Sequence, residues 1–247
     1  MTNVVGPRAT FGVIVPSTNT VVESEYYQMR PDGVSFHAGR IWISDEGLGN
    51  DEDFERFLVH LRAQLAIAVR DVLTCRPDYL VMGMSAETFW GGADGNEKFE
   101  SWIRELSGLR VSTGASACRA ALGRYGAKRI GVITPYQPVG DEQVRRFFTD
   151  LGFTVTGVRG LKCPTATSIA EVGPDTVAEA FRAVDGPGVD ALVQAGTNLC
   201  AARVAADLEQ SLGKPVIAIN TATVWHALRG NGIDDRFDGF GALLAEH

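Results

Sequence analysis

The chain has 247 residues, of which 45% are hydrophobic and 21% charged, as expected for a globular protein with a sizeable core. Its net charge of -7 and its lack of a Lys/Arg run argue against nucleic-acid binding. No apolar run approaches the roughly 20 residues of a membrane helix, and the first ten residues lack a secretory-signal pattern. We therefore expect a cytoplasmic protein that binds neither nucleic acid nor membranes.

Short runs rich in Val and Ile alternate with helical patterns, which is typical of parallel sheets covered by helices on both faces. In chain order, strands are predicted at 10–16, 35–43, 78–83, 110–113, 128–134, 153–159, 190–195 and 215–219. Helices are predicted at 20–29, 51–74, 96–106, 115–125, 140–151, 174–184, 199–212 and 222–229.

Segments of the first part of the chain return in the second part, in the same order. Asp78–Ser85 returns as Asp190–Thr197, and Gly12–Pro16 returns as Gly131–Pro135. A nearly constant offset indicates a duplicated unit. We predict an α/β fold with two similar four-stranded parallel-sheet, flavodoxin-like halves related by a pseudo-two-fold axis, with the active site in the cleft between them. The halves are residues 1–118, completed by 221–247, and residues 119–220.

Five loops follow the carboxyl ends of predicted strands, where open α/β sheets bind their ligands. They are residues 16–20, 83–88, 134–137, 195–198 and 220–223. They contain Ser, Thr and Asn but neither Lys nor Arg, and most lead into a helix N-terminus. Such neutral donors suit the carboxylate of a small substrate. For any one loop, helix capping alone explains the same residues.

Cysteine and histidine spacing indicates neither a metal site nor a disulfide framework. Cys75, Cys118, Cys163 and Cys200 form no CxxC pair, and the four histidines form no HExxH or HxH pattern. The strand-end loops also lack the glycine-rich motifs of nucleotide sites. We expect no metal and no cofactor.

At these loops the chain resembles the aspartate/glutamate racemase superfamily, in the branch of arylmalonate decarboxylase and maleate cis–trans isomerase. The resemblance runs from Gly12 to about Leu243. It implies that Asn19, in Gly12–Thr20, and Tyr136, after Thr134 and Pro135, bind a substrate carboxylate. Ser85 matches a hydroxyl donor of the decarboxylase, whereas Ala86 replaces another. Phe240, between two glycines, resembles the closing motif of the decarboxylase.

The chain departs from this family where its chemistry normally resides. The resemblance implies a cysteine after one or both of the repeated strands, but Met84 and Gly196 occupy these positions. Two-base racemisation and thiolate addition are therefore disfavoured. A thiol at a helix N-terminus has a lowered pKa, so Cys200 is a candidate reactive group, although a buried structural role is preferred. His226 is interpreted as a packed helix residue.

Other groups must then supply the acid or base. Glu87 is the one carboxylate in the central loops, and burial would raise its pKa into a useful range. Tyr136 is a second proton donor, and Thr197 with the Gly196 N–H offers an oxyanion site. Predicted catalytic residues are Glu87, Tyr136, Gly196 and Thr197. Predicted substrate-binding residues are Ser17, Asn19, Met84, Ser85, Tyr136, Thr197, Asn198 and Thr221. Three aromatic residues either wall the pocket or pack in the core: Phe89, Trp90 and Trp225.

The leading hypothesis is a cofactor-independent lyase, of decarboxylase type, that acts on a small mono- or dicarboxylic acid. One alternative is a hydrolase or hydratase in which Glu87 activates water. Another is a maleate-type cis–trans isomerase, and a third is a carboxylate-binding protein without catalysis. The sequence leaves a homo-oligomer, a dimer or larger, open as the assembly.

Overall fold

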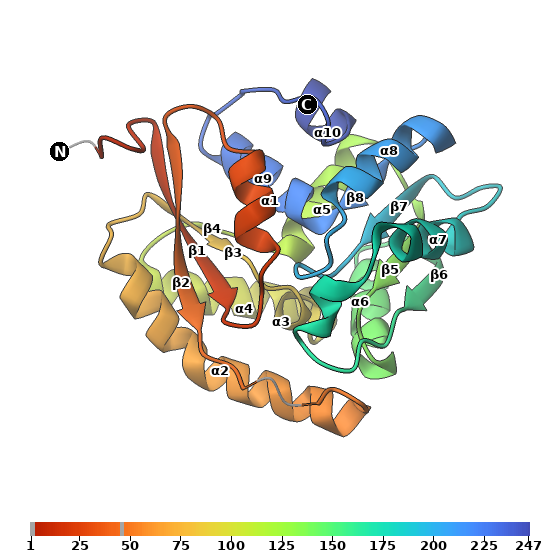
Figure 1. The fold of residues 1–247 in the computed structure, drawn as a ribbon, viewed down its shortest axis with the longest axis horizontal. Coiled ribbons are helices and arrows are strands. Elements are labelled where there is room, and N and C mark those ends of the chain that lie inside the picture. Colours follow the sequence, from red (N-terminus) through yellow and green to blue (C-terminus); the bar gives the residue numbers. More distant parts are fainter. Residues whose placement is uncertain (1–2, 45–46) are drawn as a thin grey trace.

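Two four-stranded sheets lie side by side in the computed structural model, which describes residues 3–44 and 47–247 (Figure 1). The first sheet has the order β2-β1-β3-β4 and the second β6-β5-β7-β8, with all neighbouring strands parallel. The predicted fold class is confirmed. The strands are β1 (Ala9–Pro16), β2 (Val34–Ile41), β3 (Tyr79–Met82), β4 (Val111–Ser112), β5 (Arg129–Thr134), β6 (Thr154–Gly160), β7 (Ala191–Gln194) and β8 (Val216–Ala218).

The repeated sequences occupy equivalent places in the two sheets. Gly12 of β1 is paired with Leu80 of β3, and Gly131 of β5 is paired with Leu192 of β7. All four strands are buried along almost their whole length, because helices cover the sheets. In each half, the two central strands therefore end next to each other.

Helices connect these strands and begin at local signals. Asn50 accepts a hydrogen bond from the Asp53 N–H, and Thr113 caps its helix in the same way. Two other helices begin with proline at Pro138 or Pro174. The helices are α1 (Val22–Gln28), α2 (Asp51–Leu73), α3 (Ala86–Phe89), α4 (Gly92–Ser107), α5 (Gly114–Arg124), α6 (Pro138–Asp150), α7 (Pro174–Val184), α8 (Ala202–Leu212), α9 (Ile219–Gly230) and α10 (Ala242–Glu246), with a 3₁₀ turn η1 (Ser168–Glu171).

Three short elements, α3, η1 and α10, were absent from the sequence prediction, and α4 begins four residues earlier than predicted. A helix of four or five residues spans little more than one turn, so it cannot show a repeating apolar face. The eight longer predicted helices are all present, with shifts of a few residues at their ends.

The last long helix joins the two halves. α9 packs on α5 and α1, and it also contacts β3 and β4 of the first sheet and β8 of the second. One apolar core runs from Val13 and Val81 in the first half to Val132 and Val193 in the second. The predicted boundaries near 118 and 220 fall inside α5 and α9, and the division into domains stays a prediction. Within residues 3–44 and 47–247, no helix is both long and apolar enough to cross a membrane.

Candidate active site

A pocket lies at the seam between the halves, where the loops after β1, β3, β5 and β7 meet. Its polar part comes from these loops and its apolar part from α2 and the region before α7. Met84 and Gly196, the two repeat-equivalent positions, both line it. The lining is Pro16, Thr18, Asn19, Leu48, Phe54, Phe57, Leu61, Met84, Ser85, Ala86, Pro135, Tyr136, Ala166, Ile169, Gly196, Thr197 and Asn198. In the described part of the chain, this lining holds no Lys, Arg, His, Asp, Glu or Cys.

Three residues from three loops form a hydrogen-bonded group in this pocket. The hydroxyls of Ser85 and Tyr136 are 2.6 Å apart, and the Thr197 N–H donates to Ser85 Oγ at 3.0 Å. All three residues are buried. Burial raises the pKa of Tyr136, and the Ser85 hydrogen bond opposes this only in part. Tyr136 is therefore a neutral hydrogen-bond donor at physiological pH, and the structure brings these three predicted residues together.

Asn19 and Asn198 tie the first half to the second. Asn19 Oδ1 accepts from the N–H groups of Val21 and Val22 at 3.0 Å, as a helix cap does. Its Nδ2 lies 3.4 Å from Thr197 Oγ1 and remains oriented toward the seam. Asn198 Oδ1 accepts from the Thr20 N–H at 3.0 Å. The capping interpretation therefore holds for one end of Asn19, and its amide nitrogen remains available to a ligand.

The apolar wall of the pocket comes from α2. Phe54, Phe57 and Leu61 line the pocket from one side of this helix, and the Phe54 ring lies 5.5 Å from the Tyr136 ring. Their helical spacing is visible in the sequence, but nothing there shows that this side faces the strand-end loops rather than the sheet. These residues were therefore not among the predicted site residues.

Aromatic residues that were considered for the wall lie elsewhere. Phe89 is fully buried and contacts the rings of Phe147 and Phe148, so it belongs to the core. Trp225 is also buried and does not line the pocket. Trp90 lines a different, shallower groove between α2 and α4. For Phe89 and Trp225 the core interpretation is the correct one.

Glu87 does not reach the pocket. It lies in α3, two residues after Ser85, and its Oε1 accepts a hydrogen bond from Arg62 Nε at 2.7 Å. Both residues line the groove between α2 and α4. Burial raises the pKa of Glu87, and Arg62 lowers it. The short α3 turn, which the sequence prediction lacked, directs this carboxylate away from Ser85.

Two predicted binding residues lie beside the pocket without lining it. Ser17 Oγ accepts a hydrogen bond from the Ile43 N–H at 3.0 Å, which ties the end of β1 to the residues after β2. Thr221 is buried in the first turn of α9, and its Oγ1 has no hydrogen-bond partner in the described part of the chain. Sequence position alone could not separate these residues from those that face the cleft.

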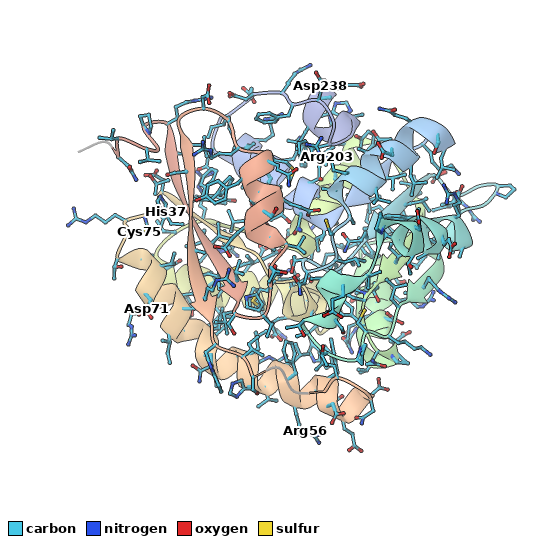
Figure 2. All side chains as sticks on the ribbon, viewed as in Figure 1. His37, Arg56, Asp71, Cys75, Arg203 and Asp238 are labelled. Carbon is cyan, nitrogen blue, oxygen red and sulfur yellow. The ribbon has the colours of Figure 1, made fainter. Side chains whose placement is uncertain are left out.

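Cys200 is exposed and lies just before α8, outside the pocket lining. Its thiol donates to Glu25 Oε1 over 3.6 Å. Partial burial and then the Glu25 carboxylate raise the thiol pKa, which is opposite to the effect expected from the helix N-terminus. The interpretation of Cys200 as a buried structural residue is therefore wrong, and the lowered thiol pKa expected at the helix N-terminus is not found. Cys75 is also exposed and lies on the flank of the first half, beyond the end of α2 (Figure 2).

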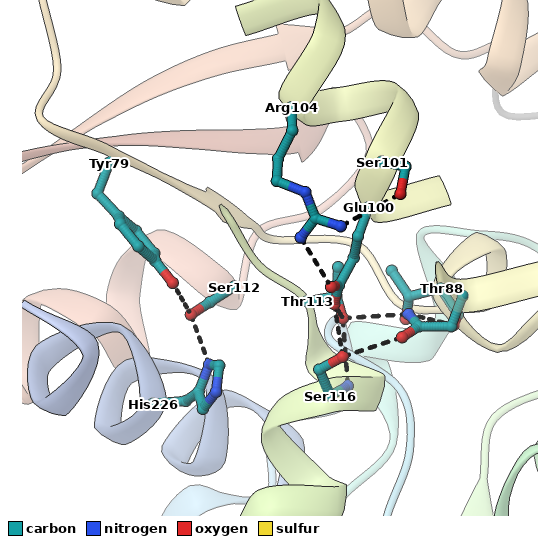
Figure 3. Close-up of polar contacts among 10 residues, drawn as sticks. Tyr79, Thr88, Glu100, Ser101, Arg104, Ser112, Thr113, Ser116 and His226 are labelled. Carbon is teal, nitrogen blue, oxygen red and sulfur yellow. Dashed lines mark hydrogen bonds and ion pairs between the residues drawn. The ribbon is translucent and has the colours of Figure 1, made fainter. Parts of the chain in front are cut away.

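His226 has the packed role expected from the sequence. Its Nδ1 lies 2.7 Å from Ser112 Oγ, which in turn lies 3.0 Å from Tyr79 Oη (Figure 3). Burial lowers the pKa of this imidazole. The contact joins α9 to β3 and β4, so His226 fastens the last long helix to the first sheet.

A second set of polar contacts supports the turn that carries Ser85. Thr88 donates through its N–H and its hydroxyl to the Ser85 carbonyl, at 2.9 and 2.8 Å. The Thr88 carbonyl accepts from buried Asn96, whose side chain also contacts Thr113 and Ser116 near Glu100 (Figure 3). These contacts hold the backbone of the turn that carries Ser85.

A family model described as arylmalonate decarboxylase matches residues 11–244. The chain belongs to this family. It is 28% identical to a maleate isomerase of Pseudomonas putida, over 95% of this chain and 96% of the relative. It is 27% identical to the arylmalonate decarboxylase of Bordetella bronchiseptica, over 96% and 97% of the two chains.

A solved structure of a Nocardia farcinica maleate cis–trans isomerase superposes with a TM-score of 0.87 and 25% identity, covering 96% of this chain and 98% of that one. Another structure of that isomerase, a cysteine-to-serine mutant, holds a covalently bound succinylcysteine intermediate. Members of the family are thus decarboxylases and isomerases of small acids. In the described residues of this chain, no group of three or more His, Cys, Asp or Glu is placed to hold a metal ion.

Proposed function

We propose that the chain is a cofactor-independent decarboxylase of small mono- or dicarboxylic acids, with a substituted malonate as the simplest substrate. The observation that carries the proposal is the composition of the pocket. Neutral donors from Ser85, Tyr136 and Thr197 converge in it, while Phe54 and Phe57 of α2 give it an apolar wall. This arrangement binds one carboxylate and offers nothing charged to a second one.

The same arrangement favours loss of carbon dioxide. A carboxylate against an apolar wall is poorly solvated, and it loses its charge when it leaves as CO₂. The bond between the α-carbon and this carboxylate breaks, and its electron pair stays on the α-carbon and the remaining carboxylate as an enediolate. The Tyr136 hydroxyl would donate to the developing oxyanion, and the Thr197 N–H, which donates to Ser85 Oγ, would share that hydrogen with it.

The α-carbon then takes up a proton from Tyr136, which water restores, or from water directly. Tyr136 is the one ionisable side chain among the described residues that line the pocket. Burial raises the pKa of Tyr136, so the hydroxyl keeps its proton at physiological pH and can pass it only to a strongly basic centre such as the carbanion-like α-carbon. Glu87 has no part in this proposal, since its carboxylate is paired with Arg62 outside the pocket.

Isomerisation of maleate is the second candidate, and the sequence similarity to maleate isomerases favours it. A covalent cysteine adduct like that of the Nocardia farcinica enzyme would require a thiol, and Met84 and Gly196 occupy the repeat-equivalent positions that line the pocket. Isomerisation here would have to proceed without that adduct. The hydratase and hydrolase alternatives depend on Glu87 in the cleft, and its place in the structure does not support them.

A proton NMR assay in deuterated buffer tests the proposal, with phenylmalonate, alkylmalonates and maleate as substrates. We expect CO₂ loss from a substituted malonate and one deuterium on the α-carbon of the product. Formation of fumarate from maleate, with no malonate turnover, would favour the isomerase. If thermal-shift titration shows binding but no acid in the panel reacts, the decarboxylase proposal is wrong and a binding protein is left.

A further inference from the structure

Glu25 is a buried carboxylate that the proposed chemistry does not use. It lies on α1 in the first half and is only 4% exposed. Burying an ionised group is costly unless several donors compensate it. Its burial raises its pKa, and each of its hydrogen bonds lowers it again. A carboxylate at such a position needs a specific set of partners, and all of those found for it lie in the second half or on α9.

Oε1 of Glu25 caps helix α8 from across the molecule. It accepts from the N–H groups of Ala201 and Ala202, at 3.2 and 3.0 Å, and from the Cys200 thiol. The helix has no capping side chain of its own, because Ala201 stands at its N-cap. The positive end of the helix dipole and two free N–H groups therefore meet a carboxylate supplied by α1.

Oε2 of Glu25 reaches the proposed site through one side chain. It accepts from Asn220 Nδ2 at 2.7 Å, and the same nitrogen donates to the Thr197 carbonyl at 2.9 Å. Thr197 is the residue whose N–H points to Ser85 Oγ. Glu25 thus holds the β7–α8 loop, residues 195–201, at both of its ends.

Within residues 3–44 and 47–247, Glu25 forms no ion pair with Lys or Arg. Arg203, in the first turn of α8, instead donates to the Gly239 carbonyl and lies over the Phe240 ring (Figure 2 labels Arg203). Glu23, the other acidic residue of α1, is half exposed and pairs with Arg40. Glu23 provides a matched control on the same helix.

We propose that Glu25 is a positioning residue for the proposed decarboxylase site, and that it fixes the β7–α8 loop so that the Thr197 N–H is held at Ser85 Oγ in the pocket lining. The Glu25→Gln variant tests this. One oxygen of the amide still accepts from α8, but its NH₂ group then faces Asn220 Nδ2, and two donors cannot bond to each other. The link from α1 through Asn220 to Thr197 is lost.

Hydrogen exchange by mass spectrometry measures the loop itself, and titration calorimetry with phenylmalonate measures the site. We expect Glu25→Gln to speed amide exchange at least about tenfold within residues 196–202, and to weaken phenylmalonate binding by about tenfold, as for one lost hydrogen bond to a charged group. Glu23→Gln should change neither. Asn220→Ala leaves the α8 cap intact, so it should speed amide exchange at Thr197 but not at Ala202. This variant replaces Glu25→Gln in the test if Glu25→Gln does not fold.

Two outcomes overturn the proposal. In the first, exchange within residues 196–202 is the same in Glu25→Gln and wild type. In the second, exchange rises across the whole chain while phenylmalonate binds as before, which would make Glu25 a general stabilising residue. The inference rests on the proposed function, but the two can fail separately. If wild type binds no acid, the proposed function fails, and the exchange comparison still decides whether Glu25 holds the loop.

Discussion

Replacing Gly196 with alanine tests how tightly the two strand-end loops are packed at the centre of the site. A Cβ atom at this position would lie 2.4 Å from Pro135 Cδ and 2.7 Å from Cγ. Carbon atoms in contact lie about 3.5–4.0 Å apart, so the proline ring would have to move by about 1 Å. Overpacking of this kind costs roughly 1–3 kcal/mol. We expect Gly196→Ala to lower the free energy of unfolding by about 2 kcal/mol.

For a chain of this size, that cost corresponds to a fall in Tm of roughly 4–8 °C. Urea unfolding followed by circular dichroism measures the change in the free energy of unfolding. Gly123→Ala, in α5, is the control, since its Cβ would have no atom within 4 Å. That variant should be as stable as wild type or up to about 1 kcal/mol more stable. A Gly196→Ala protein within about 0.5 kcal/mol of wild type would refute the packing argument.

The same clash applies to a thiol at this position. Cysteine carries the same Cβ as alanine, so Gly196→Cys would also press on the Pro135 ring. Met84, by contrast, has a buried side chain that is longer than that of cysteine, so Met84→Cys would shorten it. The two positions that the repeat relates therefore differ in what they can accept.

Three further substitutions have defined expected outcomes. Tyr136→Phe should lower kcat/KM for a substituted malonate by roughly 10- to 100-fold. Stability should fall little, because Ser85 Oγ still accepts a hydrogen bond from the Thr197 N–H. An unchanged kcat/KM would contradict the role proposed for Tyr136. Glu87→Gln should leave malonate turnover unchanged and lower the free energy of unfolding by at most about 1 kcal/mol. Loss of turnover in this variant would show that Glu87 takes part in the reaction. Burial raises the pKa of Asp141 to about 6 from an ordinary 3.8, so the stability linked to its protonated form is lost as pH rises through 6. Asp141→Asn should therefore gain stability over wild type between pH 4 and 7, and a difference that does not change over this range would contradict the raised pKa of Asp141.

Much of the fold could be predicted because its signals are local. The runs of Val and Ile and the paired segments at Asp78 and Asp190 predict eight strands in two sheets, and the structure has both sheets. That Ser85, Tyr136 and Thr197 lie close together was also predicted, since loops after parallel strands meet at the carboxyl ends of the strands.

Side-chain direction could not be predicted in the same way. Glu87 lies two residues from Ser85, yet the single turn of α3 directs it to Arg62. Glu25 and the α2 wall depend on contacts between residues far apart in the sequence, such as Glu25 with Asn220. Such pairs leave no periodic pattern in one sequence, so only the folded arrangement shows them.

The central claim is that the seam pocket holds a carboxylate by neutral donors. A crystal structure of the chain with phenylmalonate, or with its product phenylacetate, tests it most directly. We predict a carboxylate oxygen within about 3.2 Å of both the Thr197 nitrogen and Tyr136 Oη, with the ring against Phe54 and Phe57. A carboxylate bound instead by Arg62 in the groove between α2 and α4, or a pocket that stays empty at saturating ligand, would contradict the claim.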